Sequence, residues 1–237
     1  MNSTIMALTL RALLGRRRAL LLLPMPVLLV GLTLIATIAR SPVDHWGLVV
    51  FGHLGFGVIL PLTALIVGSS VLGLEIEDGT ITHLLTKPLA RSEIILSKLA
   101  VAWGVTSVAT VVPLVLSALI AGSPGLAVGL GVGAVVGALA YSAVFLALSV
   151  LSRRPVALGL LYIMLWENVL VQFVSGARVL SVQQYASTLA DGISGDRLLG
   201  STLPAMAASL LAAVFVLVGT YVATSRLRSF RLTGETS

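Results

Sequence analysis

Glu167 is the ionisable residue that most needs an explanation, because the residues around it are almost all apolar. A carboxylate near the middle of a helix in lipid costs about 2.5–3.5 kcal/mol on insertion scales, so it needs a partner, a proton or a role in passing cargo. Asn168 and Gln172 follow it closely, and His53 lies at a similar depth in another apolar segment. We predict that Glu167, His53 and Gln172 line a translocation path. A purely structural hydrogen bond from Glu167 to a neighbouring helix is the alternative.

The sequence carries no recognisable catalytic motif. Its three histidines, at positions 45, 53 and 83, form no H-E-x-x-H, and no G-x-S-x-G or paired acids occupy an apolar segment. Cysteine is absent, which excludes disulfides and thiolate metal sites. Neither of the two lysines, Lys87 and Lys98, follows a glycine, so the chain has no P-loop for ATP. We expect no enzyme activity, no metal and no cofactor.

The densest group of charges lies between Gly73 and Lys98, in the stretch GLEIEDGTITHLLTKPLARSEIILSK. Apolar residues at helical spacing precede Pro88, which cannot continue a helix because it has no amide hydrogen and clashes with the preceding turn. Ser92 is then expected to begin a second helix as its N-cap. The residues alone allow two interpretations: a solvated linker, or a docking surface for a cytosolic protein.

The composition indicates that the rest of the chain consists mainly of membrane-spanning helices. The chain of 237 residues is 57% hydrophobic and 10% charged, whereas soluble domains carry roughly 25% charged residues. A span needs about 20 mostly apolar residues, and six segments qualify. Since none shows the alternation of a barrel strand, we expect an all-α membrane protein. The six predicted spans are approximately 19–39, 48–73, 99–121, 126–151, 156–176 and 203–224.

The basic residues predict the orientation of these helices. With a cytoplasmic N-terminus, twelve of the fifteen Lys and Arg residues fall on the inner side, including Arg153 and Arg154, as the positive-inside rule requires. Both termini and residues 75–98 are therefore expected inside, and residues 177–202 outside. In the outer segment, Val182, Tyr185, Leu189 and Ile193 recur at helical spacing, which predicts a short interfacial helix; a plain loop is the alternative. We attribute the net charge of +6 to this topology and expect no nucleic-acid partner.

Residues 1–18 combine an apolar helical face with four arginines. This pattern predicts a helix lying in the membrane interface. A disordered basic tail is one alternative, and a cleaved signal peptide is another, although the apolar region that follows is long for a signal peptide.

Three glycines at four-residue spacing, Gly129, Gly133 and Gly137, mark the fourth predicted span. Small residues at this spacing let two helices approach closely in lipid. We expect them to pack against another helix of the same chain, and a contact between two copies is the alternative.

The stretch EIEDGTITHLLTKPLARSEIILSK resembles the cytoplasmic loop between the second and third helices of type-2 ABC transporter permeases. The shared pattern is one or two acids, Gly-Thr, two leucines, a proline, and a basic residue ahead of Lys98. The later stretch LLYIMLWENVLVQFVSGARVLSVQQYA resembles the fifth helix and the external region of such permeases. The resemblance implies that the loop is a coupling helix seated in an ATPase subunit. The matching positions are Glu75, Glu77, Gly79, Thr80, Leu84, Leu85, Pro88, Arg91 and Lys98. Together with Asp78, all of them except Lys98 are expected to couple the permease to the ATPase.

The resemblance also implies a function for the whole chain. Residues 1–237 would form a single transmembrane domain with an N-terminal elbow helix, in a bacterial or archaeal cell membrane. That domain would pair with a second copy or a paralogue to enclose the path, and two separate ATPase subunits would drive export. A secondary transporter and a non-transport assembly protein are the alternatives. The sequence shows neither the internal repeat nor the several midplane ionisable groups that a secondary transporter favours.

Overall fold

The computed structural model of the chain describes residues 3–14, 23–77, 91–152, 154–173, 175–195, 197–201 and 203–229. All regular structure in these ranges is helical, which confirms the predicted all-α class. Two segments, η2 and η3, are π-helices, and η4 is a 3₁₀-helix. In chain order the helices are α1 (Ser3–Leu14), α2 (Pro24–Ile38), α3 (Val43–Gly47), η2 (Leu48–Ile59), α4 (Leu60–Glu77), α6 (Arg91–Ile120), α7 (Pro124–Leu151), α8 (Pro155–Leu161), η3 (Tyr162–Leu170), α9 (Val171–Phe173), η4 (Ser175–Leu180), α10 (Val182–Ser194) and α11 (Ala205–Ser229).

Four helical stretches in the described part of the chain are long and apolar enough to cross a bilayer. They are Val43–Val71, Arg91–Ile120, Pro124–Leu151 and Ala205–Leu227, and they overlap the second, third, fourth and sixth predicted spans. The first and fifth predicted spans overlap the shorter apolar helices Pro24–Ile38 and Pro155–Leu170. Spanning by these two helices therefore stays a prediction.

The helix boundaries follow from proline and glycine. Pro24, Pro124 and Pro155 stand in the first turns of α2, α7 and α8, where the missing amide hydrogen has no helical partner to lose. Gly122 follows α6, and Gly195 caps α10, each with a φ of 78°, the left-handed geometry that glycine adopts at helix ends. One boundary differs from expectation: α6 begins at Arg91, so Ser92 lies inside the helix instead of capping it.

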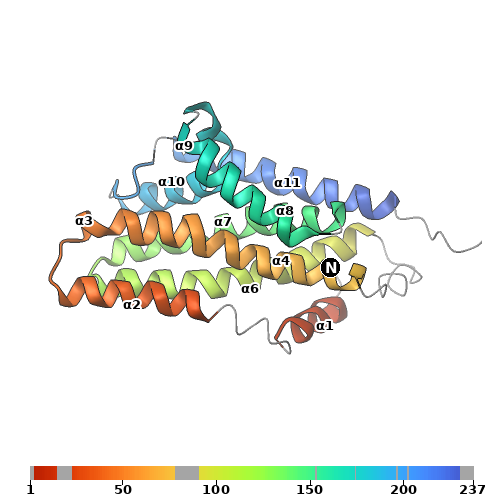
Figure 1. The fold of residues 1–237 in the computed structure, drawn as a ribbon, viewed down its shortest axis with the longest axis horizontal. Coiled ribbons are helices and arrows are strands. Elements are labelled where there is room, and N and C mark those ends of the chain that lie inside the picture. The colour runs from red at the N-terminus through yellow and green to blue at the C-terminus, as the bar shows by residue number, and fades with distance from the viewer. Residues whose placement is uncertain are drawn as a thin grey trace, which may run out of the picture.

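Helix α7 lies at the centre of the bundle. It packs on α10, α6, α11 and α4, and Figure 1 shows it running behind α4 with α11 above and α6 below. Its side chains Leu130, Tyr141 and Phe145 are fully buried in the main apolar cluster. The other elements are therefore positioned largely by their contacts with this one helix.

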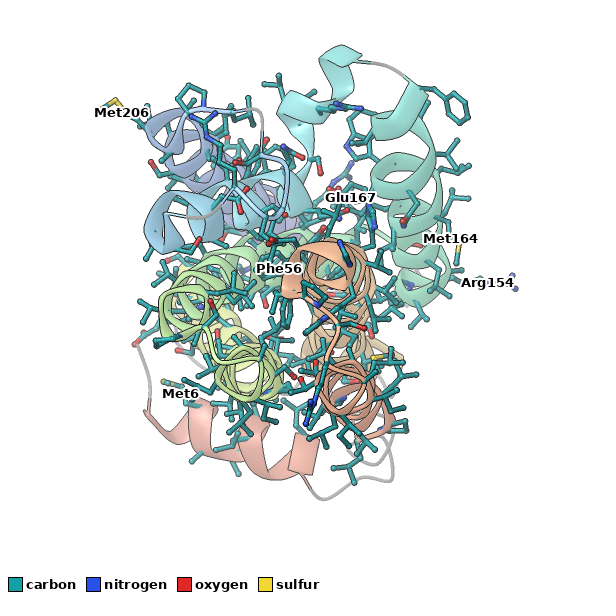
Figure 2. All side chains as sticks on the ribbon, turned by 90° about the vertical axis from the view of Figure 1, so that its left-hand side faces the viewer. Met6, Phe56, Arg154, Met164, Glu167 and Met206 are labelled. Carbon is teal, nitrogen blue, oxygen red and sulfur yellow. The ribbon has the colours of Figure 1, made fainter. Side chains whose placement is uncertain are left out.

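One end of the bundle gathers the segments that the charge distribution assigns to the cytoplasm. The end of α4, the start of α6, the end of α11 and the helix α1 all lie on the right-hand side of Figure 1. Figure 2, which looks along the bundle, shows α1 lying across the other helices. Leu13 of α1 packs against the apolar cluster at this end, whereas Leu8 is largely exposed.

Two of the three glycines of α7, Gly129 and Gly133, lie directly against the backbone of α10. A Cβ atom on Gly129 or Gly133 would lie only 2.4 Å from the carbonyl oxygen of Ala190 or Ala186, respectively. A Cβ on Gly137 would lie 2.7 Å from Cδ2 of Leu60 in α4 and 3.1 Å from the Cβ of Ala186. The predicted close contact within one chain is therefore confirmed, and its partners are α10 and, at Gly137, also α4.

We expect Gly133→Ala to destabilise the protein by about 1–3 kcal/mol, because the added methyl group overlaps a backbone carbonyl that cannot move without moving α10. Gly104→Ala is the matched control. A Cβ on Gly104 meets no atom within 4 Å, and alanine favours a helix over glycine by up to about 1 kcal/mol. The thermal unfolding midpoint of the purified protein in detergent measures both. Equal midpoints for the two variants would contradict the tight contact.

Candidate functional site

The carboxylate of Glu167 is buried, with 2% of the residue exposed, and it meets the N-terminus of α10. The hydroxyl of Ser181 donates a short hydrogen bond to Oε2, at 2.5 Å, and the amide of Val182 donates to Oε1 at 3.0 Å. The hydroxyl of Tyr162 also donates to Oε1, at 3.3 Å. Both oxygens are thus engaged by donors of the protein itself, which is how a carboxylate is retained in an apolar interior.

Helix geometry explains why Glu167 points inward. In α8 and η3 the buried residues Pro155, Gly159, Ile163 and Glu167 recur every four positions, and they form the narrow stripe of this helix that faces protein. Figure 2 shows Glu167 directed toward the bundle and Met164 directed away from it. Because η3 is a π-helix, residues five apart lie on nearly the same side, which lets Tyr162 reach Glu167.

The partner surface of Glu167 is the capped start of α10. Ser181 is the N-cap residue, and its side-chain oxygen accepts a hydrogen bond from the amide of Gln184 at 3.2 Å. The first amides of a helix have no partner within the helix, and they carry its positive pole. Glu167 therefore supplies both an acceptor and a favourable charge at this position. It ties η3 to α10 and, through α10, to the glycine face of α7.

A second buried carboxylate closes the other end of α10. Asp191, with 4% of the residue exposed, accepts hydrogen bonds from the amides of Leu199 and Ser201 at 3.0 and 3.1 Å. The side chain of Gln183 in the first turn of α10 also donates to the carbonyl of Gly52 in η2. Asp191 was not predicted as a functional residue, although an acid close to glycines in a turn can accept hydrogen bonds from nearby loop amides.

The other residues predicted to line a path do not join Glu167. The side chain of His53 is exposed, and the hydrogen bonds of Glu167 in the described structure go to Tyr162, Ser181 and Val182. Gln172 belongs to α9, and its side chain lies outside the described residues. The path predicted from these three residues stays a prediction.

The predicted coupling residues are only partly described. Glu75 and Glu77 stand in the last turn of α4, and Asp78, Gly79, Thr80, Leu84, Leu85 and Pro88 lie outside the described residues. Arg91 begins α6, and its Nη1 donates to the carbonyl of Leu227 in α11 at 2.6 Å.

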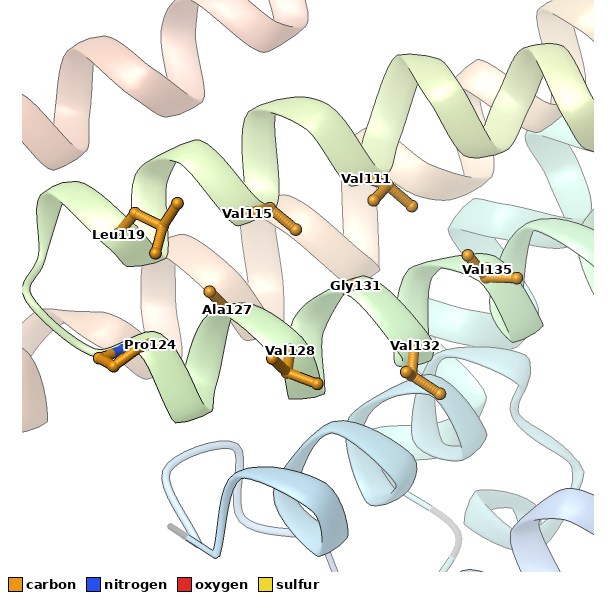
Figure 3. Close-up of a pocket in the computed structure, with 9 residues that line it drawn as sticks. All are labelled: Val111, Val115, Leu119, Pro124, Ala127, Val128, Gly131, Val132 and Val135. Carbon is orange, nitrogen blue, oxygen red and sulfur yellow. The ribbon is translucent and has the colours of Figure 1, made fainter.

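An apolar groove lies between the C-terminal half of α6 and the N-terminal half of α7 (Figure 3). Its volume is about 480 Å³, and its walls are almost entirely aliphatic. Such a surface can offer dispersion contacts but no directional recognition. The lining residues are Val111, Val115, Leu119, Pro124, Ala127, Val128, Gly131, Val132 and Val135.

These features together define a multi-pass membrane protein with a buried polar joint and, across the described residues, no cluster of potential metal ligands. Residues 16–174 match the family model described as ABC-2 family transporter protein, and the chain belongs to that family. Membership makes it a permease, the membrane component of an ABC transporter, and confirms the family inferred from the loop pattern. No curated protein matches the chain. The family match ends before η4, so it includes Glu167 but not the α10 residues that bind it.

We expect Glu167→Leu to loosen the start of α10, because it leaves the Val182 amide and the Ser181 hydroxyl without their acceptor. Each unsatisfied buried group costs about 1–3 kcal/mol. Glu167→Gln should have a smaller effect, since one amide oxygen remains to accept. Hydrogen–deuterium exchange of the amides at 182–186 measures the change.

His53→Gln is the matched control for this experiment, because His53 comes from the same sequence prediction but is exposed. Its exchange at 182–186 should equal that of the wild type. Wild-type exchange in Glu167→Leu would show that the carboxylate does not hold α10.

Proposed function

We propose that this permease is the membrane half of an ATP-driven exporter, operating in the cell membrane of a bacterium or archaeon. In this proposal all six apolar helices span the bilayer, α1 lies in the interface, and both termini face the cytoplasm. Two copies, or one copy and a paralogue, enclose the path, and separate ATPase subunits bind at the cytoplasmic end. Family membership supports the transport role, and the absence of a P-loop supports a separate source of energy.

The position of two acids at the end of α4 is the observation that carries ATPase coupling. Glu75 and Glu77 stand in the last turn of α4, and no basic residue accompanies them there. A basic surface on another protein would attract two acids that have no basic neighbour in this turn. We propose that these acids, with Asp78, Gly79, Thr80, Leu84, Leu85 and Pro88, seat the coupling segment in a groove of the ATPase.

Glu167 has a supporting role in this proposal. Its bonds to Ser181 and Val182 join η3 to α10. Helix α10 packs on α7 and belongs to the segment 177–202 that we place on the outer side. When cargo passes this end of the bundle, α10 would either stay in place or move as a rigid unit. The carboxylate would thus act on transport by fixing α10.

The ATPase interface predicts the behaviour of four variants. Glu75→Lys and Glu77→Lys should weaken association of the ATPase most at low salt, because salt screens exposed charges over about 10 Å at 0.1 M. Leu84→Ala and Leu85→Ala should weaken it with little salt dependence, by about 1.5–3 kcal/mol for each fully buried side chain. The measurement is the amount of ATPase, identified by mass spectrometry and ATP hydrolysis, that co-purifies with the tagged permease.

Asp44→Lys is the matched control for the charge reversals. Asp44 is an exposed acid in α3, at the end of the bundle opposite to the end of α4 (Figure 1). Its variant should retain the ATPase at every salt concentration. Unchanged association in all four loop variants would make residues 75–90 a solvated linker and contradict the coupling proposal.

The orientation predicts opposite labelling of two exposed arginines. The chain has no cysteine of its own, so Arg178→Cys and Arg154→Cys each introduce a single reactive thiol at an exposed site. In intact cells an impermeant maleimide should modify position 178 and not position 154. Position 154 should react after the membrane is permeabilised. The reverse pattern would invert the topology.

A further inference from the structure

The first residue of α6 is bonded to the last turn of α11, 136 positions further along the chain. Nη1 of Arg91 donates to the carbonyl oxygen of Leu227 at 2.6 Å. Leu227 lies two residues before Ser229, the last described residue of α11. Arg91 of α6 therefore binds the backbone of a helix to which it does not belong.

The chemistry of the two groups favours this contact. A hydrogen bond from a cation is shorter and stronger than one between neutral groups. This one is partly buried, so salt and water screen it less than an exposed contact. The Leu227 side chain, 1% exposed, lies in the same buried cluster as Ile94 and Ile95 of α6.

A second cation of α6 binds the helix on the other side of the coupling segment. Lys98 stands seven residues after Arg91, about two turns along the same face, and is 1% exposed. Its Nζ donates to the carbonyl oxygen of Val71 in α4 at 2.7 Å. Lys98 thus bonds α6, the helix after residues 78–90, to α4, the helix before them. Arg91 bonds α6 to α11.

We infer that Arg91 is a positioning residue that makes the start of α6 and the end of α11 move together during the transport cycle. The inference rests on the proposed function, because it requires an ATPase that displaces the coupling segment. It changes the role of Arg91 from a contact with the ATPase to a contact within the permease. Helix α11 otherwise packs mainly on α7 and α10, so Arg91 gives it a polar bond to the helix that follows the coupling segment.

The two roles of Arg91 predict different losses on mutation. If Arg91 bound the ATPase, Arg91→Ala would reduce the amount of ATPase that co-purifies. If Arg91 transmits movement to α11, the ATPase stays bound in Arg91→Ala and α11 stops responding to nucleotide. The experiment therefore measures two quantities: the change at α11 when the nucleotide is changed, and the amount of ATPase that co-purifies.

A single thiol on α11 reports this response. Ser225 is exposed, two residues before Leu227, and Ser225→Cys would be the only cysteine in the chain. The rate of maleimide modification at this position is measured in the purified permease–ATPase complex, once with ATP and vanadate and once with ADP. With Arg91 present we expect the two rates to differ. In Arg91→Ala we expect the difference to be lost while the ATPase remains bound.

Two further variants separate transmission from general damage. Arg154→Ala removes an exposed arginine from the same proposed side of the membrane, and it should keep the nucleotide-dependent difference. Arg91→Lys retains a charged donor at the start of α6 and should preserve part of the difference. It also serves as the test variant if Arg91→Ala does not assemble: lysine has no guanidinium Nη1 to reach the Leu227 carbonyl, so an undiminished difference in Arg91→Lys would contradict transmission.

The outcomes distinguish the inference from the proposed function. Equal rates with the two nucleotides in the wild-type complex, or an undiminished difference in Arg91→Ala, would overturn the role of Arg91 alone. Loss of the ATPase from Arg91→Ala, with Arg154→Ala unaffected, would assign Arg91 to the ATPase interface instead. A wild-type permease that binds no ATPase would overturn the proposed function, and the inference with it.

Discussion

The buried carboxylate of Glu167 sets a condition that the surrounding elements must meet. A charged oxygen pair in an apolar bundle is tolerated only with donors close by, and here the donors are the hydroxyls of Ser181 and Tyr162 and the amide of Val182. Meeting this condition fixes the rotation of η3 and the position at which α10 begins. The joint thus determines two elements that are separated in sequence by the turn through η4.

Helix α10 transfers that constraint to the centre of the bundle. The carbonyl oxygens of Ala186 and Ala190 lie close to the backbone of α7 at Gly133 and Gly129. At the other end of α10, Asp191 accepts hydrogen bonds from amides of the loop that leads to α11. At the opposite end, Arg91 and Lys98 join α6 to α11 and α4. The two ends are therefore organised by different chemistry: carboxylates accepting from amides at one, and cations donating to carbonyls at the other.

Local features of the chain were predictable from sequence, and pairings between distant residues were not. Helical periodicity from Val182 to Ile193 predicted a short helix, and α10 occupies Val182–Ser194. A serine immediately before that periodic stretch is an N-cap pattern, so the role of Ser181 could have been found. Nothing local indicates that Glu167 accepts from residues 14 and 15 positions later, because the turn between them decides the approach. The Arg91–Leu227 bond depends on the packing of the whole bundle, and sequence spacing carries no information about it.

The order of synthesis gives the Glu167 joint a consequence for biogenesis. The ribosome makes Glu167 before it makes Ser181 and Val182, so the fifth apolar segment reaches the insertion machinery while its carboxylate still lacks two of its donors. During that interval the segment carries the insertion cost of an unpaired acid, about 2.5–3.5 kcal/mol near the centre of a helix. Stable residence of this segment in lipid should therefore follow the emergence of α10. In a nascent chain truncated between Glu167 and Ser181, the fifth segment would lack these donors and should reside in lipid less stably than in the complete protein.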